Sequence, residues 1–213
     1  MVKLICLEGI DGCGKSTQVN MVKSNVSVGY CWLRYKPFLL KPLYIVKTIR
    51  MSKGAIKSLE QQYESNSMMK KKLFKSGIIS RIWYSIALMD YILVSKLKLS
   101  IAKRNNKLVV LDRYFFDFLI DQGLNFGWDK KKYFSEIKKL SKLFRVPDKT
   151  ILLDIPPDEA LKRKHDIPNL HYLNTRYELY NVIAKELNWD IINATLPKEE
   201  INQKILSIVE SLS

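Results

Sequence analysis

Five short apolar runs are spaced along the chain, at residues 2–7, 28–33, 107–111, 150–154 and 189–193. Runs of this length that are rich in Val, Ile and Leu are typical of buried strands. The stretches between them carry apolar residues at helical spacing, most clearly at residues 78–103, 129–144, 175–187 and from about 198 onward. Strands that alternate with helices predict an α/β fold of three layers, in which helices cover both faces of a mostly parallel five-stranded sheet.

The longest helical pattern lies at residues 78–103. Its apolar side chains recur every three or four positions and predict a core-facing stripe made of Ile79, Ile82, Ile86, Met89, Leu93 and Leu97. The same apolar helix is a candidate face for a homodimer. Residues 40–75 are polar and helical in tendency, with Pro42 near a helix start, and little chemistry can be inferred from them.

Length and composition favour one domain that spans residues 1–213, with 47% hydrophobic residues. No apolar run approaches the ~20 residues that cross a membrane. The first apolar run ends at Glu8 and is too short for a signal peptide, so a cytoplasmic protein is expected. Cys6, Cys13 and Cys31 have neither metal-ligand spacing nor the even number of a disulfide framework.

The net charge of +15 suits a nucleic-acid-binding protein or an enzyme that handles anionic nucleotides. Much of the excess is lysine in runs at residues 70–72, 130–132 and 138–139, and such runs usually form solvated helix faces. Basic and aromatic residues do not interleave as they do in proteins that bind single strands. A nucleic-acid partner is therefore not expected, whereas anionic nucleotides are.

A phosphate-binding loop follows the first apolar run. Residues 9–17 read Gly-Ile-Asp-Gly-Cys-Gly-Lys-Ser-Thr and match the P-loop pattern G-x-x-x-x-G-K-[ST] at every fixed position. Glycines allow the backbone N–H groups to turn inward, Lys15 reaches the terminal phosphates and the Ser16 hydroxyl holds Mg²⁺. The predicted nucleotide-binding residues are Gly12, Cys13, Gly14, Lys15, Ser16 and Thr17.

Charged residues follow the second and third apolar runs, at the sheet edge where parallel α/β proteins bind ligands. Asp112 is placed to hold Mg²⁺ directly or through water, and Arg113 can pair with a phosphate through two hydrogen bonds. Arg34 and Lys36 are either phosphate contacts or part of a solvated loop. Arg81, one turn into the long helix, is either a ligand contact or an ordinary surface arginine.

Four groups of residues together resemble the thymidylate kinases, a family of P-loop nucleoside-monophosphate kinases, over nearly the whole chain. They are residues 7–17 (LEGIDGCGKST), residues 112–114 (DRY) with Gln122-Gly123, residues 153–163 (LDIPPDEALKR), and residues 192–195 (INAT). The resemblance implies a P-loop NTPase fold. It also implies that Mg²⁺ assists transfer of the γ-phosphoryl group of ATP to the 5′-phosphate of dTMP, which gives dTDP and ADP.

The resemblance also implies roles for single residues. Asp11 would lie near the acceptor sugar and phosphate, and Arg81 and Arg113 would contact the monophosphate. With Arg34 from the sheet edge and the retained Gln122, the expected substrate-binding residues are Asp11, Arg34, Arg81, Arg113 and Gln122. Asn193 would join the P-loop in binding ATP. The expected metal ligands are Ser16 and Asp112.

The expected catalytic set is Lys15, Arg81, Arg113 and Arg163. Family members take an extra arginine either from the P-loop or from a lid. Because Gly12 and Cys13 occupy the variable loop positions here, the lid at about residues 162–174 is expected to supply it. Arg163 is the first choice, with Lys162 or Lys164 as substitutes.

The chain departs from the family pattern where the base is bound. Gly77 stands where the family usually has a phenylalanine that stacks on thymine. Asp117 and Asp121 replace a serine and a tyrosine after the Asp-Arg-Tyr motif, and Phe74, Phe115 or Phe118 are the candidates for stacking instead. A kinase for another nucleoside monophosphate or for a nucleoside therefore stays open. A nucleotide-dependent switch is disfavoured because no Asn-Lys-x-Asp motif is present.

Overall fold

Five parallel strands form the centre of the molecule. The computed structural model describes residues 2–38, 58–74 and 76–212. The strands are β1 (Lys3–Glu8), β2 (Gly29–Trp32), β3 (Leu108–Asp112), β4 (Lys149–Asp154) and β5 (Asp190–Asn193). Their order in the sheet is β2-β3-β1-β4-β5, and every neighbouring pair is parallel. The α/β fold with a parallel five-stranded sheet is confirmed.

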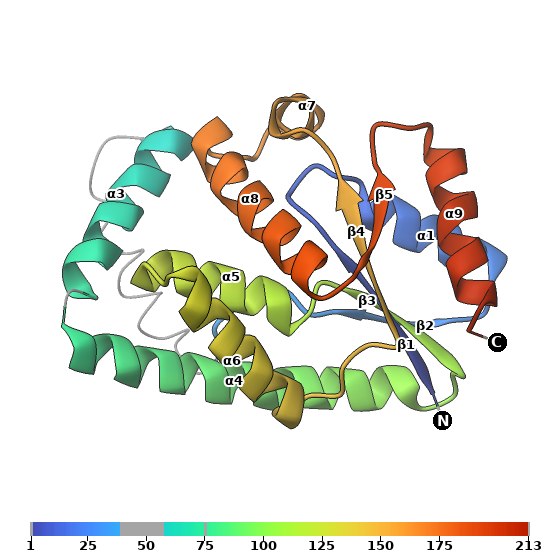
Figure 1. Cartoon of the computed structure of the whole chain (residues 1–213), viewed down its shortest axis with the longest axis horizontal. Helices are drawn as coiled ribbons and strands as arrows, with labels where there is room; N and C mark the ends of the chain where they lie inside the picture. Colours follow the sequence, from blue (N-terminus) through green and yellow to red (C-terminus); the bar gives the residue numbers. More distant parts are fainter. Residues whose placement is uncertain (1, 39–57, 75, 213) are drawn as a thin grey trace.

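Helices cover both faces of the sheet (Figure 1). They are α1 (Lys15–Asn25), α3 (Leu59–Leu73), α4 (Gly77–Lys103), α5 (Phe115–Phe126), α6 (Lys130–Leu143), α7 (Pro157–Arg163), α8 (Leu170–Glu186) and α9 (Lys198–Glu210). Helices α1 and α9 pack together beside the sheet, and α4, α5, α6 and α8 lie on the other side in Figure 1. Parallel strands joined by helices bring all five carboxyl ends to one edge, which is where the site lies.

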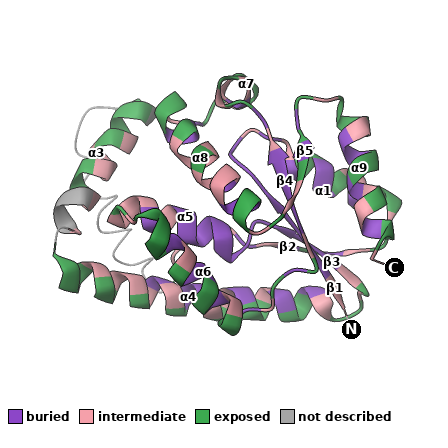
Figure 2. Ribbon diagram, in the orientation of Figure 1, coloured by how far each residue is buried: buried purple, intermediate pink, exposed green. Residues whose placement is uncertain are grey.

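The core lies between the sheet and these helices (Figure 2). Four consecutive residues of β1, from Leu4 to Leu7, have no exposed surface, because this central strand is covered on both faces. Cys6 and Cys31 are buried strand residues, as their apolar surroundings predict. Three phenylalanines of α5 are buried as well: Phe115, Phe116 and Phe118.

The apolar stripe of α4 does not face the core, contrary to the prediction from its spacing. Ile82, Met89, Leu93 and Leu97 expose 55%, 52%, 58% and 64% of their surface. The buried face of the helix is instead Ala87, Asp90, Tyr91, Ser95, Leu99 and Ala102. Small residues on this face allow α4 to lie close to β2 and β3. Both faces of the helix therefore repeat at helical spacing, but only the face with the small residues packs on the sheet.

The predicted lid at residues 162–174 overlaps two helices. Its first two residues end α7, its last five begin α8, and only residues 164–169 are non-helical. Most of the predicted polar segment 40–75, including Pro42, lies outside the described residues, and its described part is α3.

Candidate active site

The phosphate loop joins β1 to α1. Gly9, Gly12 and Gly14 have φ angles of 142°, 89° and 92°, in the left-handed region that favours glycine. A Cβ at Gly12 would lie 2.4 Å from the backbone oxygen of Ala160 in α7. Helix α1 begins at Lys15 and has no side-chain cap, so its first N–H groups are available to an anion.

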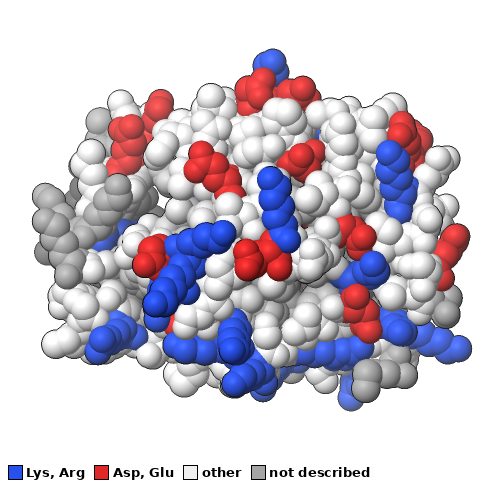
Figure 3. Space-filling model, viewed as in Figure 1, with Lys and Arg blue, Asp and Glu red and all other residues white. Residues whose placement is uncertain are grey.

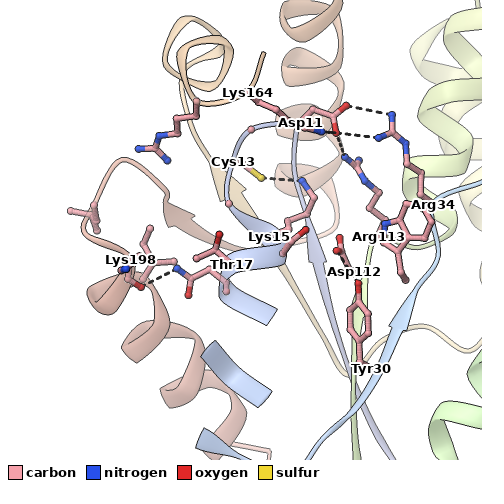
Figure 4. A pocket seen from close by; sticks show the side chains of 18 residues that line it. Asp11, Cys13, Lys15, Thr17, Tyr30, Arg34, Asp112, Arg113, Lys164 and Lys198 are labelled. Atoms are coloured by element: carbon pink, nitrogen blue, oxygen red, sulfur yellow. Dashed lines mark hydrogen bonds and ion pairs between the residues drawn. The ribbon is translucent and has the colours of Figure 1, made fainter. Parts of the chain in front are cut away.

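Lys15 lies folded against its own loop (Figure 4). Its Nζ donates to the backbone oxygens of Gly9 at 2.9 Å and Ile10 at 2.8 Å, and it lies 3.1 Å from the Cys13 Sγ. The side chain is buried, which keeps its charge next to the phosphate position. A phosphate ligand would offer Nζ stronger, charged acceptors than these neutral ones.

A cavity of about 960 Å³ opens above this loop. Eleven residues predicted for the site line it: Asp11, Gly12, Cys13, Gly14, Lys15, Ser16, Thr17, Arg34, Asp112, Arg113 and Arg163. Leu196, Lys198 and Ile201 close its far end, beyond β5. We call this space the donor cavity.

Asp11 lies within ion-pair distance of three cations in the donor cavity. Its carboxylate accepts from Arg113 at 2.7 Å and from Arg34 at 3.2 Å, and Lys164 Nζ lies 3.8 Å away. The Tyr172 hydroxyl donates to it at 3.0 Å. Burial acts to raise the pKa of Asp11, but the surrounding positive charges outweigh it and hold that pKa well below its usual range. Asp11 is therefore ionised and holds these cations around the phosphate position.

Arg113 is the most enclosed of these cations. Its side chain is 6% exposed, and its Nη1 donates to Asp117 and to the hydroxyl of Tyr180. Its backbone adopts φ 66°, which is uncommon for a residue other than glycine and is often found at functional sites. Burial acts to lower the pKa of Arg113, but the neighbouring carboxylates Asp117 and Asp11 raise it well above the usual range.

Asp112 and Ser16, the residues expected to hold Mg²⁺, both line the donor cavity. The Tyr30 hydroxyl lies 3.3 Å from an Asp112 carboxylate oxygen. No group of three His, Cys, Asp or Glu side chains gathers to hold a metal within the described part of the chain. A hydroxyl and one carboxylate suit Mg²⁺, which keeps several waters and takes further ligands from substrate phosphates.

A second cavity of about 360 Å³ lies between α3, α4, α5 and α8, and we call it the acceptor cavity. Tyr35, Trp83 and Tyr172 contribute aromatic walls. The carboxamide oxygen of Gln122 is buried and has no hydrogen-bond partner among the described residues. A buried group without a partner loses the hydrogen bond it would make in water, so a ligand that supplies one is favoured.

An ion pair lies beside Gln122 in the acceptor cavity. Arg176 donates to Asp121 at 2.5 Å, and its guanidinium lies 3.7 Å from the centre of the Tyr172 ring. Aromatic faces next to paired hydrogen-bonding groups are suited to a flat, polar ring such as a nucleobase.

The two cavities lie on either side of the contact between Asp11 and Tyr172. Tyr172 lines the acceptor cavity, while its hydroxyl reaches Asp11 in the donor cavity. Arg34 lines the donor cavity, and the next residue, Tyr35, lines the acceptor cavity. A molecule with its ring in the acceptor cavity can therefore direct a phosphate toward Asp11 and the P-loop.

The structure does not bring every predicted residue to these cavities. Arg81 is exposed on α4 and lines neither of them. Asn193 is exposed too, and its side-chain oxygen accepts from the backbone and hydroxyl of Thr195. Phe115 and Phe118 are buried in the core, so neither is available to stack on a base, and Phe74 packs against Trp83.

The two lid cations point to different parts of the donor cavity. Arg163 donates to the backbone oxygen of Ala194 at 2.8 Å, after β5. Lys164 extends toward Asp11, as Figure 4 shows. Lys162 is exposed and lines neither cavity.

Comparison with known proteins decides the family. The model of the thymidylate kinase family matches residues 55–205, more than half of the chain. The chain belongs to the thymidylate kinase family. The family and the enzyme class predicted from the sequence are therefore confirmed.

Relatives of this thymidylate kinase family member align over nearly their whole length. A thymidylate kinase of Prochlorococcus marinus (strain MIT 9312) is 30% identical over 215 residues, which cover 95% of this chain and 93% of the relative. The probable thymidylate kinase 1 of Saccharolobus solfataricus is 29% identical, with 99% of this chain and 98% of the relative covered. The solved structure of a deoxyadenosine kinase from M. mycoides with bound dATP superposes with a TM-score of 0.59 at 13% identity, over 98% of this chain and 100% of that one. That last similarity shows the fold alone.

Several residues of the site on α8 were not predicted from the sequence. Tyr172, Arg176 and Tyr180 recur every fourth position on α8, and each contacts a carboxylate or an arginine of the site. A polar and aromatic stripe at this spacing could have been noticed in the sequence. Its partners could not, because Asp11 and Asp117 lie on other elements.

Proposed function

We propose that the chain transfers the γ-phosphoryl group of ATP, bound in the donor cavity, to the 5′-phosphate of dTMP, bound in the acceptor cavity. The observation that carries this proposal is the hydrogen bond between Asp11 and Tyr172, which links the P-loop cavity to a second cavity. That second cavity holds the Gln122 oxygen, which is buried and has no partner among the described residues. A simple nucleotide-binding protein needs only the first of these two cavities.

Phosphoryl transfer relies on positioning and on positive charge, because negative charge spreads over the transferring group. Lys15 would hold the β- and γ-phosphates, while Arg34 and Arg113 would face the acceptor phosphate. Mg²⁺, held by Ser16 and Asp112 together with the phosphates, would neutralise part of the charge. No general base is needed, because the acceptor oxygen already carries a negative charge.

The acceptor cavity also supports a second candidate, a kinase for another nucleoside monophosphate. Asp121 places a carboxylate beside Gln122, and carboxylates accept hydrogen bonds from exocyclic amines such as that of cytosine. Thymine has no such amine. The pair of Asp121 and Arg176 therefore favours testing dCMP and dAMP beside dTMP.

The deciding experiment measures ADP release with each common nucleoside monophosphate and with the matching nucleosides. We expect turnover with dTMP above all other acceptors and none with nucleosides. A Lys15→Met variant serves as the control for contaminating kinases and should lose turnover with every acceptor. Absence of turnover with all monophosphates would overturn the kinase proposal, and a preference for dCMP or dAMP would replace dTMP as the acceptor.

We also propose that the protein is a cytoplasmic homodimer paired through α4. Within the described residues, α4 alone is long and apolar enough to cross a membrane. Its buried face, however, packs on β2 and β3 as part of the folded domain. An apolar stripe on the other face suits pairing with the same stripe of a second copy, because a two-fold axis places identical surfaces together.

A further inference from the structure

Arg113 is held between two carboxylates that come from different elements. Asp11 of the phosphate loop accepts from its Nη2 at 2.7 Å, and Asp117 of α5 accepts from its Nη1. The Gly9 backbone oxygen and the Tyr180 hydroxyl also lie within 3.4 Å and 3.2 Å of Nη1. The guanidinium that we propose to face the acceptor phosphate thus already has two anions. Any role of these anions in acceptor binding rests on that proposed function.

The two carboxylates depend on Arg113 to different degrees. Asp11 has further positive partners in Arg34 and Lys164. Asp117 shares one oxygen between Arg113 and the Tyr180 hydroxyl, the latter at 2.5 Å. Its other oxygen is buried and has no hydrogen-bond partner among the described residues. Because Arg113 is the one cation paired with Asp117 among the described residues, drawing the guanidinium toward an acceptor phosphate costs more at Asp117 than at Asp11.

We infer that Asp117 is a positioning residue that acts through Arg113 and weakens binding of the acceptor phosphate. It holds the guanidinium toward Asp11 from the first turn of α5, beside the left-handed backbone of Arg113. Its negative charge also offsets the positive charge that would otherwise attract the acceptor. Looser acceptor binding leaves more of the interaction energy for the transition state, where the charge is spread over the transferring group.

The substitution Asp117→Asn removes the negative charge of the side chain but keeps its size and shape. Its side-chain oxygen can still accept from Arg113 and Tyr180, so the geometry around Arg113 is kept. Its amide group replaces the carboxylate oxygen that has no hydrogen-bond partner among the described residues, so no hydrogen bond of Asp117 is lost. The fold should therefore tolerate Asp117→Asn.

The test compares the affinity of wild type and Asp117→Asn for dTMP, for thymidine and for ATP, each measured alone by calorimetry. We expect the Kd for dTMP to fall about fivefold, while the Kd for thymidine and ATP stays within about twofold. Thymidine is decisive because it fills the same cavity but has no phosphate. The kcat of the variant should fall as its KM for dTMP falls.

Glu136→Gln is the matched control, because it removes the same charge from a buried carboxyl that lines neither cavity. It should leave all three affinities unchanged. Asp117→Ser serves if the asparagine variant fails to fold. Unchanged or weaker dTMP binding, or equal gains for dTMP and thymidine, would overturn the inference. If the wild type turns over no nucleoside monophosphate, the proposed function itself is wrong. If the wild type is active but the affinities do not change as expected, only the inference about Asp117 is wrong.

Discussion

Two cations of the lid, Arg163 and Lys164, are neighbours in the sequence but contact different partners in the donor cavity. Arg163 is tied to the Ala194 backbone after β5, whereas Lys164 Nζ lies 3.8 Å from Asp11. Of the two, only Lys164 lies within ion-pair distance of Asp11 among the described residues. We therefore propose Lys164 in place of Arg163 as the cation that the lid supplies.

We expect Lys164→Met to lower kcat about a hundredfold with a small change in KM for ATP. Arg163→Met, the matched variant at the next position, should raise KM for ATP and lower kcat less. Steady-state kinetics with saturating acceptor would measure both effects. A larger loss of kcat in Arg163→Met than in Lys164→Met would restore the role first expected from the sequence.

At this scale the sequence predicted the phosphate loop well, because its residue types, spacing and backbone are linked in one short segment. Lys15 and Ser16 needed no tertiary information. The acceptor side could not be predicted in the same way, since Asp117 and Tyr180 meet only after α5 and α8 pack together. The family resemblance predicts that Arg81 contacts the monophosphate, but Arg81 is exposed and lines neither cavity.

Among the elements, α4 shows why periodicity alone does not identify the core side of a helix. Ile82, Met89, Leu93 and Leu97 are exposed, whereas the buried face carries the small residues Ala87, Ser95 and Ala102 together with Tyr91 and Leu99. Small residues are buried because the sheet approaches closely, a requirement that hydrophobicity does not encode. The strand ends were predicted to within one residue, because short apolar runs admit few other structures in an α/β chain.

The exposed face of α4 leads to a test of the homodimer. Leu93→Lys with Leu97→Lys places two charges in the last turns of the stripe, so we expect the double variant to be monomeric where wild type is dimeric. Sedimentation equilibrium at micromolar concentration would measure this. Leu143→Lys, a similarly exposed apolar position on α6 outside the stripe, should remain dimeric. A monomeric wild type, or one that binds lipid vesicles through this face, would contradict the dimer.

At the scale of the whole molecule, positive charge is found both on the surface and inside the site. On the face that Figure 3 shows, Lys and Arg side chains line the lower edge, and others lie among Asp and Glu above it. Further cations converge on Asp11 inside the donor cavity. Cations gathered at an internal site suit an enzyme that draws in anionic nucleotides.

The buried charges also determine how the stability of the molecule depends on pH. Burial, aided by the charge of Asp117, raises the pKa of Glu8 to about 8, although Arg113 and Lys15 act to lower it. The folded state therefore holds the Glu8 proton more tightly than the unfolded chain, whose pKa is near 4.5. This favours folding at mildly acidic pH and is lost progressively as the pH rises from about 5 to about 8. Asp11 has the opposite effect, because its lowered pKa adds stability at neutral pH that is lost progressively as the pH falls below about 4.

We expect the free energy of unfolding, measured in urea at constant ionic strength, to fall between about pH 5 and pH 8 in the wild type. The slope from one such proton is at most about 1.4 kcal/mol per pH unit. Glu8→Gln should flatten this fall, because glutamine keeps the oxygen that accepts from the Tyr114 backbone at 2.8 Å but does not titrate. Both proteins share nearly the same surface charge, so general repulsion affects them equally. A fall of equal steepness in the variant would show that another group binds the proton, whereas a flat profile assigns it to Glu8.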